Sequence, residues 1–575
     1  MKYSKLVEVY EDLENTSSKL KKTEIIAEFL EKTNVDELAK ITLLVQGKIF
    51  PGWSEKEIGI ALQTMMKVIS SSLGIDASRV EQEFKKTGDL GLVAEKLMGK
   101  KKQTTLFKKD LSADKVFENL KKLADIEGKG TQNIKIQIVS ELVAHASAKE
   151  AKYIVRTTIG DMRIGVAEGI VRDAVAKAFL KDEDWKEAVK AVERAWFVRP
   201  DYGEVAQIAK ESGLKGLSGV KLEIGKPYHV LLSEKAPSME KALDSYEKIV
   251  VEVKYDGARL CIHKKDEKVW LFTRRLENVT KQFPEVVSWA KTNIKSNNCI
   301  IEAEMLGFDG KTKQPLPFQF LSQRIKRKYD IEKIAKDIPV QINIFDITYL
   351  DGKVLFNEIL EKRLELLKNV VKPIAGKFQL VKGIRTKDIE KVEEFYKKAL
   401  SDSQEGVMVK NLEAIYQPGR RVAGGWLKVK PTMENLDLAI IGAQWGTGKR
   451  TGWLGTLMLG CRDEKSGKFM SCGMIGTGIK EKSSGIEGNI DVTFKQLTKL
   501  LKPNIESESG VNLKIRPKVV IEVAYEEIQR STNYESGFAL RFPRVIRLRT
   551  LDKSAEQCDT LERIRRLYKM QKGGV

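Results

Sequence analysis

The hydrophobic and polar residues of roughly the first 215 positions recur with the period of a helix. Apolar residues lie three and four apart, as at Val139, Leu142 and Val143, with polar residues between them. Glycine and proline are concentrated at short junctions such as 50-FPGW-53. This spacing places the apolar side chains on one face of a helix. The segment is therefore predicted to be all-α.

A period of two begins near residue 226. The stretch 248-KIVVEVKYDGARLCIH-263 alternates in this way and is rich in β-branched residues, which predicts strands. Strand-like runs continue to about residue 430 and alternate with predicted helices at 283–293 and 386–400. The middle of the chain is thus expected to mix strands and helices.

Short strand-like runs with glycine and threonine follow Pro431. They lie at 436–449, 453–461 and 518–528. Short, closely spaced strands separated by turn residues are typical of a small barrel.

Composition points to a partner and excludes some classes of protein. Of the 575 residues, 42% are hydrophobic, which excludes a wholly disordered chain. Lys and Arg number 101 against 80 Asp and Glu, a net charge of +21. A chain this basic is expected to bind a polyanion, first of all nucleic acid. Contacts mostly to phosphates would be independent of base sequence and would weaken steeply with salt.

Cysteine and histidine are too sparse for several kinds of site. The five cysteines show no CxxC spacing, which argues against a disulfide framework and a structural zinc site. Three histidines argue against a His-rich metal site or a Ser-His-Asp triad. No apolar run approaches the ~18 residues that cross a bilayer, and the charged N-terminus is no secretory signal. A cytoplasmic protein with no membrane partner is expected.

Charged residues of the middle region lie two apart with one apolar residue between them. The pairs are Glu252 and Lys254, Glu302 and Glu304, and Lys428 and Lys430. Residues i and i+2 share one face of a strand. Each pair taken alone would also fit a half-exposed sheet with a solvated face.

Three further features favour a nucleotide site over a solvated face. The turn 254-KYDG-257 is followed by Arg259, the stretch 405-EGVMVK-410 again combines a carboxylate with a lysine, and 426-WLKVK-430 adds two cations. Cations offset phosphate charge, while carboxylates hold a metal or ribose hydroxyls. Such a face suits a nucleoside triphosphate with Mg²⁺.

Lys254 is the candidate nucleophile of this site. A free lysine is almost wholly protonated at neutral pH. Neighbouring cations and a metal disfavour the ammonium, so Arg259, Lys410, Lys428 and Lys430 are expected to lower the pKa of Lys254. The free amine could then attack phosphorus and form a covalent intermediate.

These motifs, in this order, resemble those of the covalent nucleotidyltransferase superfamily. The whole chain resembles an ATP-dependent DNA ligase of the archaeal and eukaryotic replicative type. This resemblance implies an all-α DNA-binding domain over residues 1–216 and an α+β adenylation (nucleotidyltransferase) domain with antiparallel sheets over 217–431. It implies an OB-fold β-barrel with a C-terminal helix over 432–575.

The resemblance also implies a role for single residues. Lys254 would become the AMP-lysine. Residues implied to contact the nucleotide are Glu252, Arg259, Arg274, Glu304, Arg324, Phe345, Lys410, Arg421, Lys428 and Lys430, with Phe345 stacked on adenine and Arg274 near the ribose or the 5′-phosphate of the nick. Glu304 and Glu405 would lie at the metal. The C-terminal motif would supply Arg541, Arg544, Arg547 and Lys553 to orient pyrophosphate. Gln103, Leu106 and Phe107 resemble a peptide that binds a sliding clamp.

The activity implied is the sealing of nicks in duplex DNA during replication, repair and recombination. ATP and Mg²⁺, or Mn²⁺, would be required, and the protein would act as a monomer. A swing of the barrel about a hinge near Pro431 and Thr432 would separate the steps. The alternatives are an RNA ligase, an RNA-capping guanylyltransferase, and a non-catalytic DNA-binding protein tethered to a clamp. The lack of a four-cysteine cluster argues against an NAD-dependent ligase.

Overall fold

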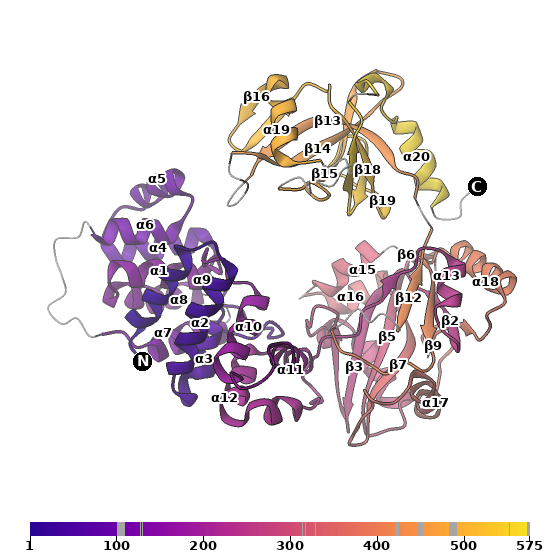
Figure 1. Cartoon of the computed structure of the whole chain (residues 1–575), viewed down its shortest axis with the longest axis horizontal. Helices are drawn as coiled ribbons and strands as arrows, with labels where there is room; N and C mark the ends of the chain where they lie inside the picture. The colour runs from indigo at the N-terminus through magenta and orange to yellow at the C-terminus, as the bar shows by residue number, and fades with distance from the viewer. Residues whose placement is uncertain are drawn as a thin grey trace.

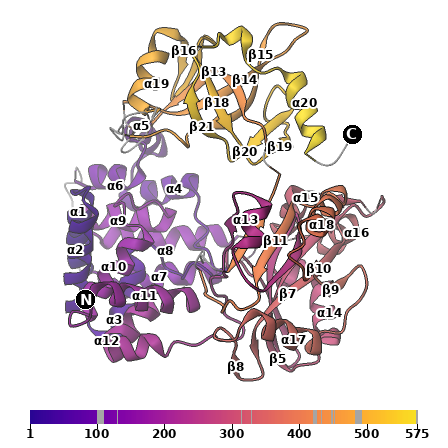
Figure 2. The same ribbon diagram turned by 45° about the vertical axis from the view of Figure 1, so that its right-hand side comes forward.

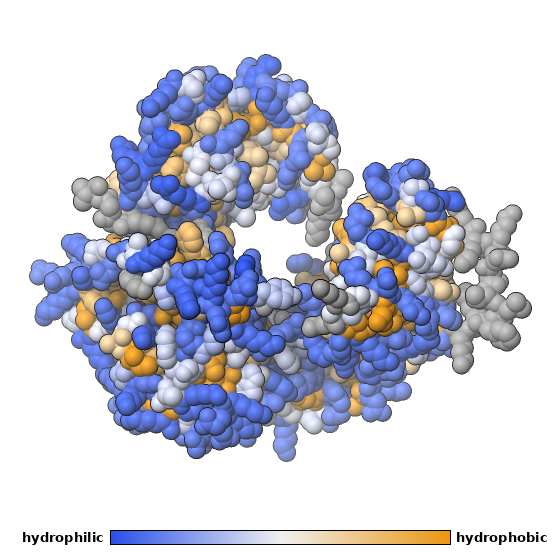
Figure 3. All heavy atoms as spheres, turned by 180° about the vertical axis from the view of Figure 1, so that it is seen from behind, coloured by the Kyte–Doolittle hydropathy of each residue, from blue (hydrophilic) through white to orange (hydrophobic). Residues whose placement is uncertain are grey.

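Three domains surround a central opening in the computed structural model (Figures 1 and 2). The structure describes residues 1–99, 110–126, 128, 130–312, 314–316, 318–327, 329–419, 425–431, 433–446, 450, 452–481, 492–550 and 552–571. A space-filling view from behind shows the opening bordered by all three domains, whose visible surfaces are largely hydrophilic (Figure 3). No helix within the described ranges is long and apolar enough to cross a membrane.

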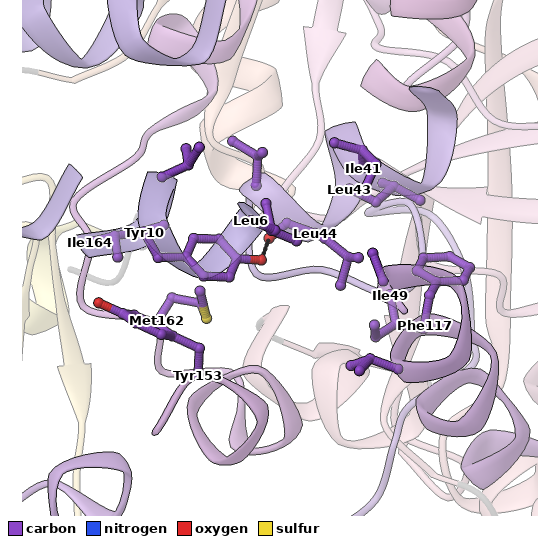
Figure 4. Packing of buried hydrophobic residues seen from close by; sticks show 14 of the residues in the cluster. Leu6, Tyr10, Ile41, Leu43, Leu44, Ile49, Phe117, Tyr153, Met162 and Ile164 are labelled. Carbon is purple, nitrogen blue, oxygen red and sulfur yellow. Dashed lines mark hydrogen bonds between the residues drawn. The ribbon is translucent and has the colours of Figure 1, made fainter. Parts of the chain in front are cut away.

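The first domain is helical, as predicted from the period of its apolar residues. Its helices are α1 (Tyr3–Glu14), α2 (Lys19–Lys32), α3 (Val35–Val45), α4 (Leu62–Leu73), α5 (Ala77–Thr87), α6 (Leu90–Gly99), α7 (Ala113–Lys122), α8 (Thr131–His145), α9 (Ala148–Ile159), α10 (Glu168–Phe179), α11 (Trp185–Val198) and α12 (Tyr202–Ser218). One apolar core holds them together, and Figure 4 shows part of it, with the Tyr10 hydroxyl donating to the Leu44 carbonyl at 2.7 Å.

Helix α9 illustrates how local sequence and tertiary packing agree in this domain. Ser147 and Glu150 form a capping box at its start, and Gly160 ends it in the left-handed conformation. Arg156, only 1% exposed, forms an ion pair with Asp89 at 2.6 Å and another with Glu14. Removing one partner would leave a buried charge without compensation, so the pairs fix the packing of α9 against α6 and α1.

The middle domain consists of two sheets with helices around them. Its elements are β1 (Glu234–Lys235), α13 (Met239–Asp244), β2 (Ile249–Lys254), β3 (Ala258–Lys265), β4 (Lys268–Thr273), α14 (Pro284–Asn293), β5 (Asn298–Phe308), β6 (Pro315–Leu316), α15 (Phe318–Ile325), α16 (Ile331–Asp337), β7 (Val340–Leu350), β8 (Lys353–Val354), α17 (Leu360–Val370), β9 (Phe378–Leu380), β10 (Gly383–Ile384), α18 (Ile389–Ser401), β11 (Gly406–Asn411) and β12 (Trp426–Val429). The helices predicted at 283–293 and 386–400 are confirmed as α14 and α18.

The two sheets have separate strand orders. One runs β1-β12-β11-β2-β10, and the other runs β4-β3-β5-β7-β8, with β6 beside β5 and β9 beside β7. The pairs are antiparallel, as expected, except for the short parallel pairs β1–β12 and β7–β9.

The third domain is a curled antiparallel sheet of the OB type. It contains β13 (Leu436–Trp445), β14 (Leu454–Arg462), β15 (Phe469–Ile475), α19 (Phe494–Leu501), β16 (Ile505–Ser509), β17 (Asn512–Ile515), β18 (Val520–Ala524), β19 (Glu527–Arg530), β20 (Phe538–Arg541), β21 (Arg544–Leu548) and α20 (Leu561–Met570). The single strand expected at 518–528 is two strands, because β18 pairs with β13 and β21 whereas β19 pairs with β20. The domain limits 216/217 and 431/432 stay predictions.

Gly406 allows β11 to approach its neighbour β12. Its φ is +139°, and a Cβ built there would lie 2.2 Å from the carbonyl oxygen of Val429. Any side chain would therefore push β12 away from β11, on the two strands that carry Glu405 and Lys430 at their ends.

Replacing Gly406 with alanine should destabilise the protein by more than backbone strain alone. A residue with a side chain at positive φ costs about 1–2 kcal/mol, and the steric overlap should add ~1–3 kcal/mol. Urea unfolding would measure the difference. Gly352→Ala is the matched control, because Gly352 also has positive φ (+96°) but open space where its Cβ would lie. An equal loss of unfolding free energy in the two variants would contradict the steric account.

Candidate functional site

The five-stranded sheet brings the predicted charged residues onto one face. Lys254 on β2 lies opposite Gly406 on β11. Glu252 lies opposite Met408, which in turn lies opposite Lys428 on β12. Directly paired residues point to the same side of a sheet. The interpretation drawn from the period of two is thus confirmed for β2, β11 and β12, and the opposite face packs into an apolar core.

The second sheet contributes its own charged face. Arg259 on β3 pairs with Glu304 on β5, and Cys261 pairs with Glu302. Between β5 and β7 the register skips Phe345, because Glu302 pairs with Asp346 and Ala303 with Ile344. Such a bulge re-aims the extra side chain. Phe345 consequently meets Trp426 of the first sheet at a centroid distance of 5.7 Å, edge to face.

Lys254 is paired with a carboxylate. Its Nζ lies 2.6 Å from Glu405 Oε2, and Lys430 Nζ lies 2.5 Å from the same oxygen. Burial disfavours the Lys254 ammonium, but Glu405 and Glu304 outweigh it and raise the pKa of Lys254 above the ordinary lysine value. The expectation that surrounding cations lower this pKa is therefore wrong for the protein alone. It overlooked the carboxylate that lies between the lysines.

The two lysines of β12 differ from Lys254 and from each other. Burial, together with the charges of Lys430 and Lys254, lowers the pKa of Lys428. Lys430 also approaches Glu526 of the barrel domain at 4.0 Å. This end of β12 therefore faces both the middle domain and the barrel.

Two carboxylates near Lys254 have opposite protonation behaviour. Burial would raise the pKa of Glu405, but Lys254 and Lys430 outweigh burial and lower it to about 2. Burial raises the pKa of Glu304 to about 7, against the opposing charges of Lys254 and Arg259. A carboxylate with a raised pKa lacks charge compensation, and hard divalent cations bind carboxylate oxygens. Glu304 thus fits a divalent cation, and Glu405, although paired with two lysines, offers further carboxylate oxygen to it; the described residues contain no group of three or more His, Cys, Asp or Glu placed to hold one.

An aromatic cluster, formed by Phe345 and Trp426, adjoins the charged residues. Lys410, 2% exposed, is paired with Glu252 at 2.5 Å. Its Nζ lies 4.5 Å from the ring centre of Phe345 and 4.1 Å from that of Trp426. The guanidinium of Arg259 lies 5.3 Å from each of the same two rings. Lys410, which the resemblance implied to contact the nucleotide, thus lies beside the rings.

Several predicted residues lie away from Lys254. The guanidinium of Arg324 is buried and bonded to the carbonyls of Gln282 and Ile338 and to Glu285. Arg274 is exposed in a pocket that it shares with Trp196 and His229 at the junction with the helical domain. Arg421, like Gln103, Leu106 and Phe107, falls outside the described residues.

The four residues of the C-terminal motif lie in three different settings. Arg541, paired with Glu527, lines the cleft between the barrel and the middle domain together with Glu405 and Lys430. Arg544 is an exposed residue at the start of β21. Two further residues are held within the barrel, where Arg547 contacts Glu522 and Lys553 contacts Asp437, each at 2.6 Å.

Sequence reasoning assigned no role to five residues that the structure places in or beside these clusters. They are Tyr228, Glu302, Tyr416 and Trp426 in or near the aromatic cluster, and Arg549, which joins Asp437, Glu522 and Asp552 in the barrel. The alternation that identified Glu304 also marks Glu302, and Trp426 begins the stretch that supplied Lys428 and Lys430. The tyrosines lie outside the strands and carry no such signal.

Comparison with known proteins gives matches along most of the chain. The family model described as ATP dependent DNA ligase domain matches residues 230–430, that of the DNA ligase N terminus matches 2–176, and that of the ATP dependent DNA ligase C terminal region matches 450–552. A DNA ligase of Nanoarchaeum equitans is 47% identical over 576 residues, covering 100% of both chains. A DNA ligase of Thermococcus onnurineus is 42% identical over 572 residues, covering 99% of this chain and 98% of its own.

A solved structure shares the fold. The chain titled Pmar-Lig_PreS3 aligns with 95% of this chain and 99% of its own length, with a TM-score of 0.56 and 18% identity.

The raised pKa of Glu304 should make Glu304→Gln stabilising at neutral pH. Between pH 4.5 and 7 the carboxyl ionises in the unfolded chain before it does so in the folded one. Wild-type stability therefore falls as pH rises through this window, whereas the glutamine variant lacks this loss. The advantage of the variant should grow from nearly zero at pH 4.5 to roughly 2–3 kcal/mol near pH 7.5. Urea unfolding with a chelator present would measure it.

Glu405→Gln is the control of opposite sign. The lowered pKa of Glu405 contributes stability that is present above pH 4.5 and is lost as pH falls towards 2. This variant should be destabilised at neutral pH. The same pH dependence in wild type and Glu304→Gln would refute the assignment.

Proposed function

The chain belongs to the ATP-dependent DNA ligases, and from this premise we propose that it seals nicks in duplex DNA through AMP carried on Lys254. The observation that carries the proposal is the cluster of Lys254, Lys428, Lys430, Glu304 and Glu405 beside the aromatic cluster. The match of residues 2–176 to the DNA ligase N terminus favours this activity over the RNA-ligase and capping alternatives.

In the first step, Lys254 Nζ attacks the α-phosphorus of ATP. A nitrogen–phosphorus bond forms, the bond to the β-phosphate oxygen breaks, and pyrophosphate leaves. Lys428 and Lys430 extend from the neighbouring strand and would offset charge on the α-phosphate. Arg541, at the cleft beside Glu405 and Lys430, is the residue of the C-terminal motif best placed to reach the leaving pyrophosphate.

The proton on Lys254 must leave before attack. Glu405 and Glu304 hold that proton in the protein alone, since their charges raise the pKa of Lys254. A divalent cation, for which we propose Mg²⁺ with Mn²⁺ as a substitute, would compensate these carboxylates and the phosphate charge when bound there. Lys428 and Lys430 would then act on Lys254 as like charges and favour the amine.

The aromatic cluster supports recognition of adenine. A base that contacts the Phe345 ring would gain about 0.5–1.5 kcal/mol from this contact. Arg259 would contact the nucleotide too, because its buried Nε finds no hydrogen-bond partner in the part of the chain that the structure describes.

The last two steps require DNA to bind on the side of the middle domain that faces the barrel in this structure. AMP passes from Lys254 to the 5′-phosphate of the nick, and the 3′-hydroxyl then attacks that phosphate and expels AMP. Arg541 and the DNA ends would compete for the same side of the middle domain, which supports a movement of the barrel between steps about residues near Pro431.

The proposal extends to the partners of the protein and to its location in the cell. The net charge of +21 and the opening bordered by three domains support duplex DNA as substrate (Figure 3). We also propose that the protein is a monomer in the cytoplasm. It would bind a sliding clamp through 103-QTTLF-107.

Labelling tests the nucleophile and the cofactor together. Incubation with α-labelled ATP, GTP and NAD should label Lys254 from ATP only, and Lys254→Ala should lose the label and the sealing of nicked DNA. Lys248→Ala is the control, since this exposed lysine contacts Glu413 outside the site. Label that persists in Lys254→Ala, or that comes from GTP, would refute this assignment. A preference for nicked RNA would refute the substrate.

Phe107→Ala should weaken binding to the sliding clamp of the same organism at least tenfold, because an apolar anchor of the proposed peptide is lost. Surface plasmon resonance would measure the affinity. Thr105→Ala, within the same segment, should bind as wild type does, and labelling of Lys254 should be unchanged in both variants. Equal affinities in all three proteins would exclude this segment as the clamp contact.

A further inference from the structure

A single buried carboxylate, Glu302, holds the arginine that faces the aromatic cluster. Glu302 is 0% exposed. Its Oε1 accepts hydrogen bonds from the hydroxyls of Tyr228 at 2.7 Å and Tyr416 at 2.5 Å, and its Oε2 forms an ion pair with Arg259. A buried charge is tolerated when its oxygens are paired and hydrogen-bonded in this way.

The contacts of Glu302 close into a ring through the backbone of Leu231. The Leu231 N–H donates to the Tyr416 hydroxyl at 2.9 Å, and the Leu231 carbonyl accepts from Arg259 Nη1 at 2.5 Å. Tyr416 and Arg259 both return to Glu302. The segment before β1 is thus tied to β3 and β5 through one carboxylate, although the residues come from four distant parts of the chain.

A second chain of hydrogen bonds fixes Tyr228 from behind. The Gly225 N–H donates to His263 Nδ1 at 3.2 Å, which leaves Nε2 of this ring as the N–H that faces Cys261 Sγ at 3.3 Å. Cys261 Sγ donates to the Tyr228 hydroxyl at 3.8 Å. Every polar group in this series has a donor or acceptor role that its neighbour complements. Such a network rigidifies the groups it joins.

This ring of hydrogen bonds fixes Arg259 beside the aromatic cluster. Arg259 is held from two sides, by Glu302 and by the Leu231 carbonyl, and its guanidinium faces both Phe345 and Trp426. Burial raises the pKa of Tyr416 and of Tyr228 far above the ordinary phenol value, so both stay hydrogen-bond donors throughout the physiological range. Neither tyrosine lies against the Lys254 cluster in any contact that the structure describes.

We propose that Tyr416 and Tyr228 are positioning residues which, through Glu302, hold Arg259 and Leu231 beside the rings of Phe345 and Trp426 and thereby set the affinity for the adenine nucleotide. This inference rests on the proposed function. The competing account is an ordinary buried network that stabilises the fold alone. The two accounts differ in whether nucleotide affinity changes separately from the rate of the chemical step.

Tyr416→Phe tests the proposal because it removes one hydroxyl and keeps the ring that stacks on Phe356. The ATP concentration that half-saturates labelling of Lys254 should rise about tenfold, while the rate at saturating ATP falls less than threefold. Glu302→Gln should raise the half-saturating concentration further, because its amide N–H₂ would face the guanidinium of Arg259. In the double variant the fold-rise in half-saturating ATP concentration should be smaller than the product of the two single fold-rises, since both substitutions open the same ring.

Tyr10→Phe is the matched control. It deletes another buried phenol hydroxyl, which donates to the Leu44 carbonyl in the helical domain. It should lower the thermal midpoint about as much as Tyr416→Phe does and leave the half-saturating ATP concentration unchanged. Tyr228→Phe, which opens the network at a different atom, provides the test if Tyr416→Phe does not fold.

The outcomes separate this inference from the function it rests on. If wild-type protein takes no label from ATP at Lys254, the proposed function fails. If wild type is labelled but Tyr416→Phe or Tyr228→Phe shows the half-saturating concentration of wild type, only the positioning role is overturned. A lower labelling rate at saturating ATP with an unchanged half-saturating concentration would likewise overturn the positioning role.

Discussion

The arrangement of the site depends on the register between β2 and β11. Lys254 lies opposite Gly406, so the residue before Gly406 is brought next to the lysine amine. Because Gly406 has no side chain, β12 can approach closely, and Lys430 reaches the same carboxylate from the other side. A slip by one residue would turn Lys254 and Glu252 into the apolar core behind the sheet. One backbone pairing thus fixes a nucleophile, its counter-ion and a second cation together.

The sequence was sufficient where a single local rule decides the outcome. The period of apolar residues predicted the helical domain, and the period of two predicted which residues of β2, β11 and β12 share a face. It was insufficient where distant segments meet. Tyr416 and Tyr228 reach Glu302 across 114 and 74 positions of the chain, and no periodicity connects a loop residue with a strand so far away. The rings of Phe345 and Trp426 meet because of a bulge in β7, which the alternation of residues does not reveal.

The pKa of Lys254 shows the same difficulty in electrostatic form. Counting charges near the lysine in sequence gave an excess of cations, which lower a lysine pKa. The sign of the shift depends on distance, because the interaction of two charges grows as they approach. Glu405 lies 2.6 Å from Lys254 Nζ. Its negative charge therefore raises the pKa of Lys254 by more than the nearby lysines lower it. The order of residues contains Glu405, but only the fold shows that this carboxylate lies between two ammonium groups.

Two carboxylates of β5, Glu302 and Glu304, have different roles in the middle domain. The oxygens of Glu302 accept from two phenols and a guanidinium, so this group is compensated and its neighbours are fixed. Burial raises the pKa of Glu304, two residues along the same strand. A cation that approached this group would therefore stabilise its ionised form. The groups around Arg259 are consequently rigid, while Glu304, near Lys254, lacks a compensating charge. A site that must bind the same base every time and pass a phosphoryl group between partners requires both properties, and adjacent positions on β5 supply them.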